Sequence, residues 1–406
     1  MGGILFLTDT VPCPLGRSDR VRGYHFLAQL ARQQRVHLLA FADDRDDVRR
    51  KDALARLCVT RALLWRSAPG LGQRLSADLA GTPPGMISPE DGQMRAAIRS
   101  AVTARRIDMI FAQSLRMALL VPESLPQKLV VDLMEPPSLR AHAFARTAGL
   151  GVKLRWRRLA RRLEAQEEIA AARADTLLLA GPDRAARFGD KAMVAGNGVD
   201  TGHFAREAVA RRLEAPGVLI GLIGQHHHAA DRAAMSWFMD AVLPHIRAIH
   251  ADVRLVLLGS IAPAALAELE QRHPGVKVAH GDQRPWLAGA TLLVAPWLHA
   301  GGSSLPILEA MAMGRPVIAT TAAAGTLDHG GTLHVGHDVG EIVDRVLQFA
   351  SPGFPATEIG SLARGHIQRH HFWDASAAPV FVAPASIAPH GADAAGLQPR
   401  GEENVR

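Results

Sequence analysis

Short apolar segments alternate along the chain with longer segments whose apolar residues recur at helical spacing. After a first apolar segment at 4–7, Val21, Leu27 and Ala31 fall on one face of a helix predicted over 19–33. Further strands of the buried type are predicted at 36–41, 61–65, 107–112, 128–133, 175–180 and 191–195. These segments are continuously apolar rather than alternating, which indicates a parallel sheet covered by helices on both faces.

A second series of the same kind follows a polar stretch at 206–216, which we interpret as a linker. The series predicts strands at 218–223, 253–258, 276–279, 291–295 and 316–319, and helices at 231–250 and 339–349. A chain of 406 residues suits two domains better than one core. We therefore predict an α/β fold in which two Rossmann-like parallel-sheet domains, at 1–205 and 217–350, face a cleft.

The segment AGGSSLPILEAMAMGRPVIATT, at 300–321, is the most informative stretch of the second series. Two glycines and two serines stand directly before a short predicted helix: Gly301, Gly302, Ser303 and Ser304. Serine can cap the free amides of a first helical turn, and glycine lets a ligand approach them closely, so the pattern suits a phosphate site. The alternative is an ordinary loop, helix and strand of an α/β domain.

Two segments of the first series follow predicted strands and point to the same site, because ligands of parallel sheets bind at the carboxyl ends of strands. The loop at 8–18 contains Gly16 and Arg17, and Arg22 follows soon after; these arginines are either anion binders or a solvated helix start. Asp132 and Glu135 leave the fifth strand together. They are candidates for a general base or, alternatively, for caps of a neighbouring helix.

The composition is that of a globular protein, since 48% of the residues are hydrophobic and 21% are charged. Two cysteines, Cys13 and Cys58, are too few for a disulfide framework and fit a reducing compartment. We find no signal segment and no apolar stretch long enough to span a bilayer. We therefore expect a cytoplasmic protein, either soluble or peripheral on the membrane. The net charge of +7 favours an anionic partner.

Basic residues concentrate in the segment KLRWRRLARRLEAQEEIAAA, at 153–172. A basic amphipathic helix with Trp156 at the interface suits an anionic membrane surface, docked through residues 153–163. The alternative is a solvated helix whose basic start pairs with Glu164, Glu167 and Glu168 at helical spacing. Nucleic acid ranks third, because only 5% of the residues are aromatic and we find no binding motif.

Five motifs, in this order, resemble those of retaining glycosyltransferases of the GT-B fold (group 1, family 4-like). They are GNGVDTGHF at 196–204, LIG at 222–224, LVLLGS at 255–260, HGDQRPWLAGATLLVAPW at 280–297, and the segment at 301–321. More specifically, the chain resembles the sugar transferases of bacterial exopolysaccharide and exosortase (PEP-CTERM) systems. That resemblance rests on the start of the chain at 4–41, on VVDLMEPPS at 130–138 and on HIQRHHFWDASAAPVF at 366–381.

The resemblance implies transfer of a sugar, with retention, from a nucleotide diphosphate sugar to a saccharide acceptor, free or lipid-linked. The donor would lie against the second domain, with Glu309 holding the ribose, and the acceptor against the first, near Gly16, Arg17 and Arg22. Asp132, Glu135 and Glu309 are the catalytic candidates. No metal and no cofactor are expected, and residues 351–382 would return to the first domain. The implied donor contacts are Gly224, Gln225, Gly259, Arg284, Gly301, Gly302, Ser303, Ser304, Leu305 and Glu309.

The chain departs from that family's pattern where charge is expected. Gly301 stands where better-known members have a first glutamate, Pro306 stands where relatives often have lysine, and Gly224 is followed by glutamine and three histidines at 225–228. Consecutive histidines in a loop seldom face one ion, so we do not predict a metal there. Two alternatives stay open: a catalytically silent binding protein and a sugar-nucleotide epimerase. The tail at 383–406 is predicted to be disordered.

Overall fold

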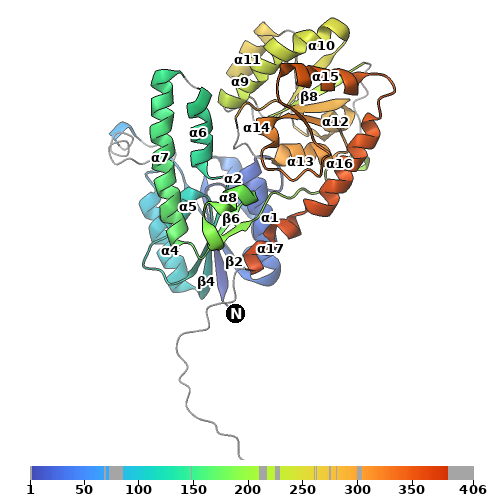
Figure 1. Ribbon diagram of the computed structural model, residues 1–406. Coiled ribbons are helices and arrows are strands. Elements are labelled where there is room, and N and C mark those ends of the chain that lie inside the picture. Colours follow the sequence, from blue (N-terminus) through green and yellow to red (C-terminus); the bar gives the residue numbers. More distant parts are fainter. Residues whose placement is uncertain are drawn as a thin grey trace, which may run out of the picture.

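The computed structural model describes residues 2–67, 70–72, 86–147, 149–209, 217–224, 229–259, 261, 263–273, 276–279, 281–299 and 304–382. Two parallel sheets form two α/β domains, and the carboxyl ends of the first sheet face the second domain (Figure 1). The predicted fold class, two Rossmann-like parallel-sheet domains, is therefore confirmed. Within the described ranges, no helix combines the length and apolar character needed to cross a membrane.

The first sheet has seven parallel strands in the order β3-β2-β1-β4-β5-β6-β7. Its interior strand β1 carries Leu5, Phe6 and Leu7, whose side chains are fully buried because helices cover both faces. The strands are β1 Gly3–Thr8, β2 Arg35–Ala42, β3 Thr60–Trp65, β4 Ile107–Gln113, β5 Lys128–Met134, β6 Thr176–Leu179 and β7 Ala192–Val194. The helices are α1 Ser18–Gln33, α2 Arg45–Ala53, α4 Asp91–Ala104, α5 Leu115–Leu120, α6 Pro137–Thr147, α7 Leu150–Arg173 and α8 Pro182–Ala186.

The second sheet has six parallel strands in the order β10-β9-β8-β11-β12-β13. They are β8 Leu219–Ile223, β9 Arg254–Leu258, β10 Lys277–Val278, β11 Leu292–Ala295, β12 Val317–Thr320 and β13 His334–Gly336. The helices are α9 Ala229–Trp237, α10 Leu243–Ile249, α11 Pro263–Arg272, α12 Arg284–Gly289, α13 Leu305–Ala312, α14 Thr321–Ala324 and α15 Val339–Ala350. The single helix predicted at 231–250 is divided by a π-helical turn, Phe238–Val242, before Pro244. Proline lacks the amide that would continue the α-helical hydrogen bonds.

Two helices after the second sheet run back toward the first domain. Helix α16 (Ala356–His370) packs on α13, where Gly360 lies against the main chain of Gly314, which has a φ of +68°. Helix α17 (Trp373–Val382) packs on α1 and contributes Trp373 to the first domain's core. The chain therefore crosses between the domains at the junction of α16 and α17 (Figure 1). The predicted tail at 383–406 lies outside the described residues.

Candidate functional site

A cavity of about 800 Å³ lies between the two domains, at the carboxyl ends of the strands. From the first domain it is lined by the loop after β1, the start of α1 and residues around the start of α2. From the second domain it is lined by the ends of β8 and β9, the start of α12 and the first turns of α13. The predicted site residues that line it are Gly16, Arg17, Gly224, Gly259, Arg284, Leu305 and Glu309.

Glycines follow the two neighbouring strands β8 and β9, whose ends line the cavity. Gly224 follows β8 and donates its amide to the carbonyl of Leu258 at 3.0 Å, and Gly259 follows β9 with a φ of +132°. Without side chains at these positions, a ligand can lie directly on the main chain. The predicted contacts Gln225, Gly301, Gly302 and Ser303 lie outside the described residues.

Ser304 is the N-cap of α13, as predicted, yet its hydroxyl makes no capping bond. Its backbone is already α-helical, with φ −68° and ψ −13°, whereas a capping serine normally has extended geometry. Asn197, in the segment between β7 and the second domain, reaches the Ser304 hydroxyl at 3.5 Å. Pro306 occupies the first turn of α13, where a missing amide is tolerated, and lines the cavity.

Glu309 lines the cavity from the second turn of α13 and is half-buried there. Removal from water disfavours its charged form and raises the pKa of the carboxyl to about 8. At neutral pH this shift favours the protonated carboxyl. A protonated carboxyl can both donate and accept a hydrogen bond, which suits a partner rich in hydroxyls.

Arg284 lines the cavity as predicted, but its guanidinium is fixed by neighbours. It forms two bonds to Oδ2 of Asp282, at 3.1 and 2.7 Å, and Nη1 reaches Nδ1 of His203 at 3.2 Å. The hydrogen bonds from Arg284 hold the pKa of Asp282 below its usual value, and those bonds raise the pKa of Arg284 in turn. This pair therefore stays ionised across the ordinary pH range and forms one edge of the cavity.

The first-domain wall includes an ionic cluster that the sequence reasoning missed. Asp47 is fully buried and binds Arg20 and Arg50, each at 2.6 Å, while both arginines line the cavity. Burial alone would raise the pKa of Asp47, but the Asp43 amide and the two guanidinium groups hold it below its usual value. The sequence analysis looked for site residues directly after β1 and β5. The same search after β2 would have found this cluster, because α2 follows that strand.

Arg22 and Asp132 do not have the roles predicted for them. They form a fully buried, bidentate ion pair at 2.7 and 2.8 Å, with side chains only 1% exposed. The remaining donors of Arg22 bind the carbonyls of Ala195 and Gly196 and the side chain of Asn197. Neither group lines the cavity. We therefore correct the prediction of an acceptor contact and a general base to an internal ion pair that anchors the start of the interdomain segment.

Glu135 lies at the domain boundary rather than beside Asp132. Its carboxylate binds Nε of Arg184 in α8 at 2.5 Å, and Nη1 of Arg184 reaches the hydroxyl of Thr326 in the second domain. Burial raises the pKa of Glu135 although Arg184 opposes the shift. Gly181 makes this approach feasible, because a Cβ there would lie 2.6 Å from the Thr326 hydroxyl. In this arrangement the glutamate links the two domains.

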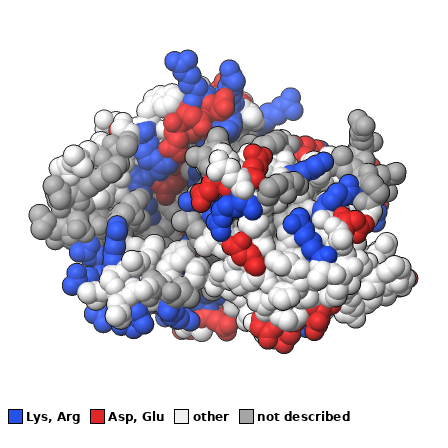
Figure 2. Space-filling model, turned by 90° about the horizontal axis from the view of Figure 1, so that it is seen from above, with Lys and Arg blue, Asp and Glu red and all other residues white. Residues whose placement is uncertain are grey.

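Helix α7 exposes only part of its predicted basic face. Leu150 and Leu154 are exposed, by 89% and 52%, and Arg157, Arg158 and Arg161 follow on the same side of the helix. On the molecular face of Figure 2, Lys and Arg are spread over several places and lie among acidic side chains.

Trp156 and two acidic residues of α7 contact other elements. The Trp156 ring packs on Phe144 of α6 at 4.7 Å, and Phe144 contacts the ring of His299 in the second domain at 4.8 Å. Glu167 binds Ser138 and Arg187, and Glu164 binds His142. The tryptophan is therefore half-buried against α6 rather than an exposed interfacial anchor, and both glutamates bind side chains outside their own helix.

Residues 217–351 match the family described as glycosyl transferases group 1. This match covers the second domain. No curated protein matches the chain in sequence. The solved structures that resemble the whole chain do so at low sequence identity, and they show its fold, which is GT-B.

The structure of Anabaena Alr3699/HepE in complex with UDP and glucose has a TM-score of 0.67 and 15% identity, covering 95% of this chain and 100% of that one. WaaG, a glycosyltransferase involved in lipopolysaccharide biosynthesis, has a TM-score of 0.63 and 12% identity, covering 94% and 100%. A putative UDP-N-acetylglucosamine 2-epimerase from Listeria monocytogenes has a TM-score of 0.56 and 14% identity, covering 94% and 96%.

Proposed function

We propose that this protein transfers a sugar from a nucleotide diphosphate sugar to a saccharide acceptor in the cleft between its domains. The observation that carries the proposal is the cavity itself. Its walls are β8, β9 and α13 of the second domain, which matches the glycosyltransferase family, and the basic loop after β1 of the first domain. Because the similar HepE structure contains UDP and glucose, we take UDP-sugars as the first donors to test.

The donor diphosphate would lie at the start of α13, over Gly224 and Gly259. The N-terminal turn of a helix favours anions, and the two glycines allow the phosphates to approach the main chain. Glu309, one turn further along α13, would bind the ribose hydroxyls. Arg284 stands at the edge of the same wall, already oriented by Asp282.

Catalysis would rest on positioning and charge stabilisation rather than on a protein nucleophile. Asp132 is held by Arg22, and the carboxylates that line the first-domain wall, Asp43 and Asp44, bind Arg66 and Arg50. We propose that the acceptor hydroxyl attacks the anomeric carbon from the face that the diphosphate leaves. The departing phosphate oxygen takes the hydroxyl proton, so that the new bond retains the donor configuration.

The acceptor would lie against the first domain near Gly16 and Arg17, and it would come from a cell-surface or exopolysaccharide glycan, either free or lipid-linked. The exposed face of α7, formed by Leu150, Leu154, Arg157, Arg158 and Arg161, would hold the protein on the anionic inner surface of the plasma membrane. Apolar residues at the start of this face and arginines further along match the chemistry of a lipid interface.

Two alternative functions would give different results in the same incubation. A catalytically silent binding protein is favoured by Pro306, which stands where relatives often have lysine, and an epimerase is favoured by the likeness to the Listeria structure. The test incubates the protein with UDP-sugars, with and without a lipid-linked saccharide extract, and follows nucleotide and sugar products by NMR. Acceptor-dependent release of UDP supports transfer, and the coupling constant of the product reports retention. Sugar interconversion without acceptor, or no product from protein that binds the donor, overturns the proposal.

A further inference from the structure

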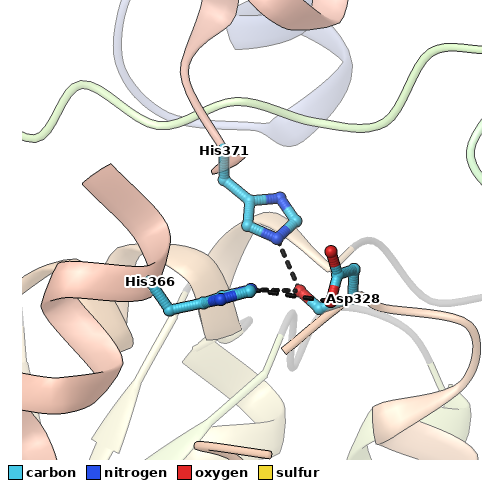
Figure 3. Close-up of side chains that lie close together, drawn as sticks. All are labelled: Asp328, His366 and His371. Atoms are coloured by element: carbon cyan, nitrogen blue, oxygen red, sulfur yellow. Dashed lines mark hydrogen bonds and ion pairs between the residues drawn. The ribbon is translucent and has the colours of Figure 1, made fainter. Parts of the chain in front are cut away.

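Three side chains with metal-binding chemistry meet at the crossover between α16 and α17 (Figure 3). Asp328 comes from the loop after α14, His366 from the last turns of α16, and His371 from the C-cap of that helix. One potential ligand atom of each lies within 4.8 Å of the others. His366 is buried and Asp328 is exposed, so the group opens to solvent on the carboxylate side.

Both histidine rings direct the same nitrogen, Nε2, to one point. Nε2 of His371 lies 2.5 Å and Nε2 of His366 lies 3.3 Å from the main-chain oxygen of Asp328. Nε2 of His366 is also 3.6 Å from Oδ1 of the same aspartate. Ligand atoms bound at 2.0–2.2 Å to one tetrahedral ion lie roughly 3.3–3.6 Å apart. The distance between His366 Nε2 and Asp328 Oδ1 is therefore already near the spacing that such an ion requires.

Surrounding groups hold the two rings in place. Gly330, with a φ of +53°, leaves room for the His366 ring, which a Cβ at this position would overlap. The carbonyl of His371 accepts the amide of Val199 at 2.9 Å, which fixes the junction to the interdomain segment.

We propose that Asp328, His366 and His371 bind a divalent transition-metal ion of the zinc class. Two imidazoles and one carboxylate form a ligand set that zinc accepts, with water or the Asp328 main-chain oxygen as the fourth ligand. Each ring then carries its proton on Nδ1 instead of Nε2. The sequence analysis expected no metal, because Asp328 is distant from the two histidines along the chain and only the fold brings it to them.

The ion has a structural role in this proposal, remote from the reaction. It ties a loop of the second domain to the segment that leaves for the first domain. Two residues beyond His371, the ring of Trp373 stacks on His25 of α1 at 4.4 Å, inside the first domain's core. Binding at the junction therefore fixes the start of α17 relative to the second domain.

The test titrates ZnCl₂ into metal-free, tag-free full-length protein by calorimetry, with no nucleotide present. The expected result is one ion per chain at this site and a Tm that rises with zinc, since the ion binds the folded state. His366→Gln and His371→Gln should each weaken zinc binding at least about tenfold, because removing even an outer partner of a ligand costs 10–100-fold. His370→Gln is the matched control, because its ring lies beside His366 without belonging to the group.

A second variant distinguishes this site from the three consecutive histidines at 226–228. In this triple variant all three of those histidines are changed to glutamine. Zinc binding that survives in this triple variant and disappears in His366→Gln/His371→Gln supports the proposal. Binding that is unchanged in the double variant, or wild-type protein that takes up no zinc, overturns it. If His366→Gln does not fold, His371→Gln and the visible spectrum of wild-type protein with Co²⁺ decide, since a three-ligand site gives tetrahedral cobalt bands that should be absent from the variant.

Discussion

Arg22 and Arg32 lie on the same helix, but their ion pairs contribute very differently to the free energy of unfolding because their surroundings differ. All five N–H donors of Arg22 are used within the core, whereas Arg32 pairs with Asp374 at the surface, where both side chains are more than half exposed. Removing one partner of a buried pair leaves the other charge without compensation, while an exposed pair contributes little.

We therefore predict that Arg22→Ala lowers the free energy of unfolding by about 3–5 kcal/mol and that Arg32→Ala changes it by about 0–1 kcal/mol. Urea unfolding followed by circular dichroism measures both variants under the same conditions. Similar losses in the two proteins would contradict the assignment of Arg22 to an internal ion pair.

The second prediction at the residue scale concerns the pH dependence that Glu309 introduces. Its folded-state pKa of about 8 lies above the value of about 4.3 for an exposed glutamate, so the folded protein holds the proton more strongly. Stability from this group is fully present below the unfolded pKa and is lost as pH rises through 8. The Tm of the wild-type protein should therefore fall between pH 5 and 8 more steeply than that of Glu309→Gln. Each kcal/mol of stability lost should lower the Tm by about 2–4 °C. Parallel Tm–pH curves would argue against the raised pKa.

At the scale of elements, the contact between α13 and α16 holds α13 in position beside the cavity. Gly360 of α16 lies so close that a Cβ would overlap the Gly314 carbonyl, whereas a Cβ at Gly365 of the same helix meets open space. Gly360→Ala should destabilise the protein by about 1–3 kcal/mol through overpacking. Gly365→Ala should stabilise it by about 0.5–1 kcal/mol, because alanine favours the helix. Thermal unfolding of both variants checks the opposite signs, and equal effects would contradict this packing.

The elements were predicted well where hydrophobic periodicity determines them. Most strands of the two sheets begin and end within about two residues of the predicted bounds, because each is a continuous apolar segment between polar loops. β13 was missed because a strand of only three residues gives no periodic signal. The motifs singled out Gly224, Gly259 and Glu309, all of which line the cavity. The contacts of Arg22, Asp132 and Trp156 could not be predicted, because strand-end position and charge do not reveal which side chain turns inward.

At the scale of the whole molecule, the exposed face of α7 predicts how the protein meets a membrane. The protein should sediment with vesicles containing anionic phosphatidylglycerol and much less with neutral vesicles, and added salt should weaken the binding. Arg157→Glu/Arg158→Glu should abolish this binding. The control Arg99→Glu/Arg247→Glu makes the same change of charge at exposed positions of α4 and α10 and should bind normally. Equal losses in the two variants would indicate a response to net charge rather than docking through α7.

The central claim is that the interdomain cavity binds a nucleotide diphosphate sugar against α13. The most direct measurement is the Tm of the full chain with UDP, GDP, ADP and their sugar conjugates, in wild-type protein, Glu309→Ala and the exposed-glutamate control Glu270→Ala. A ligand at 100 times its Kd adds about 2.7 kcal/mol to the stability of the folded state. We expect one nucleotide family to raise the Tm of wild-type protein and Glu270→Ala, but not that of Glu309→Ala. No shift with any nucleotide, or an undiminished shift in Glu309→Ala, would contradict the account.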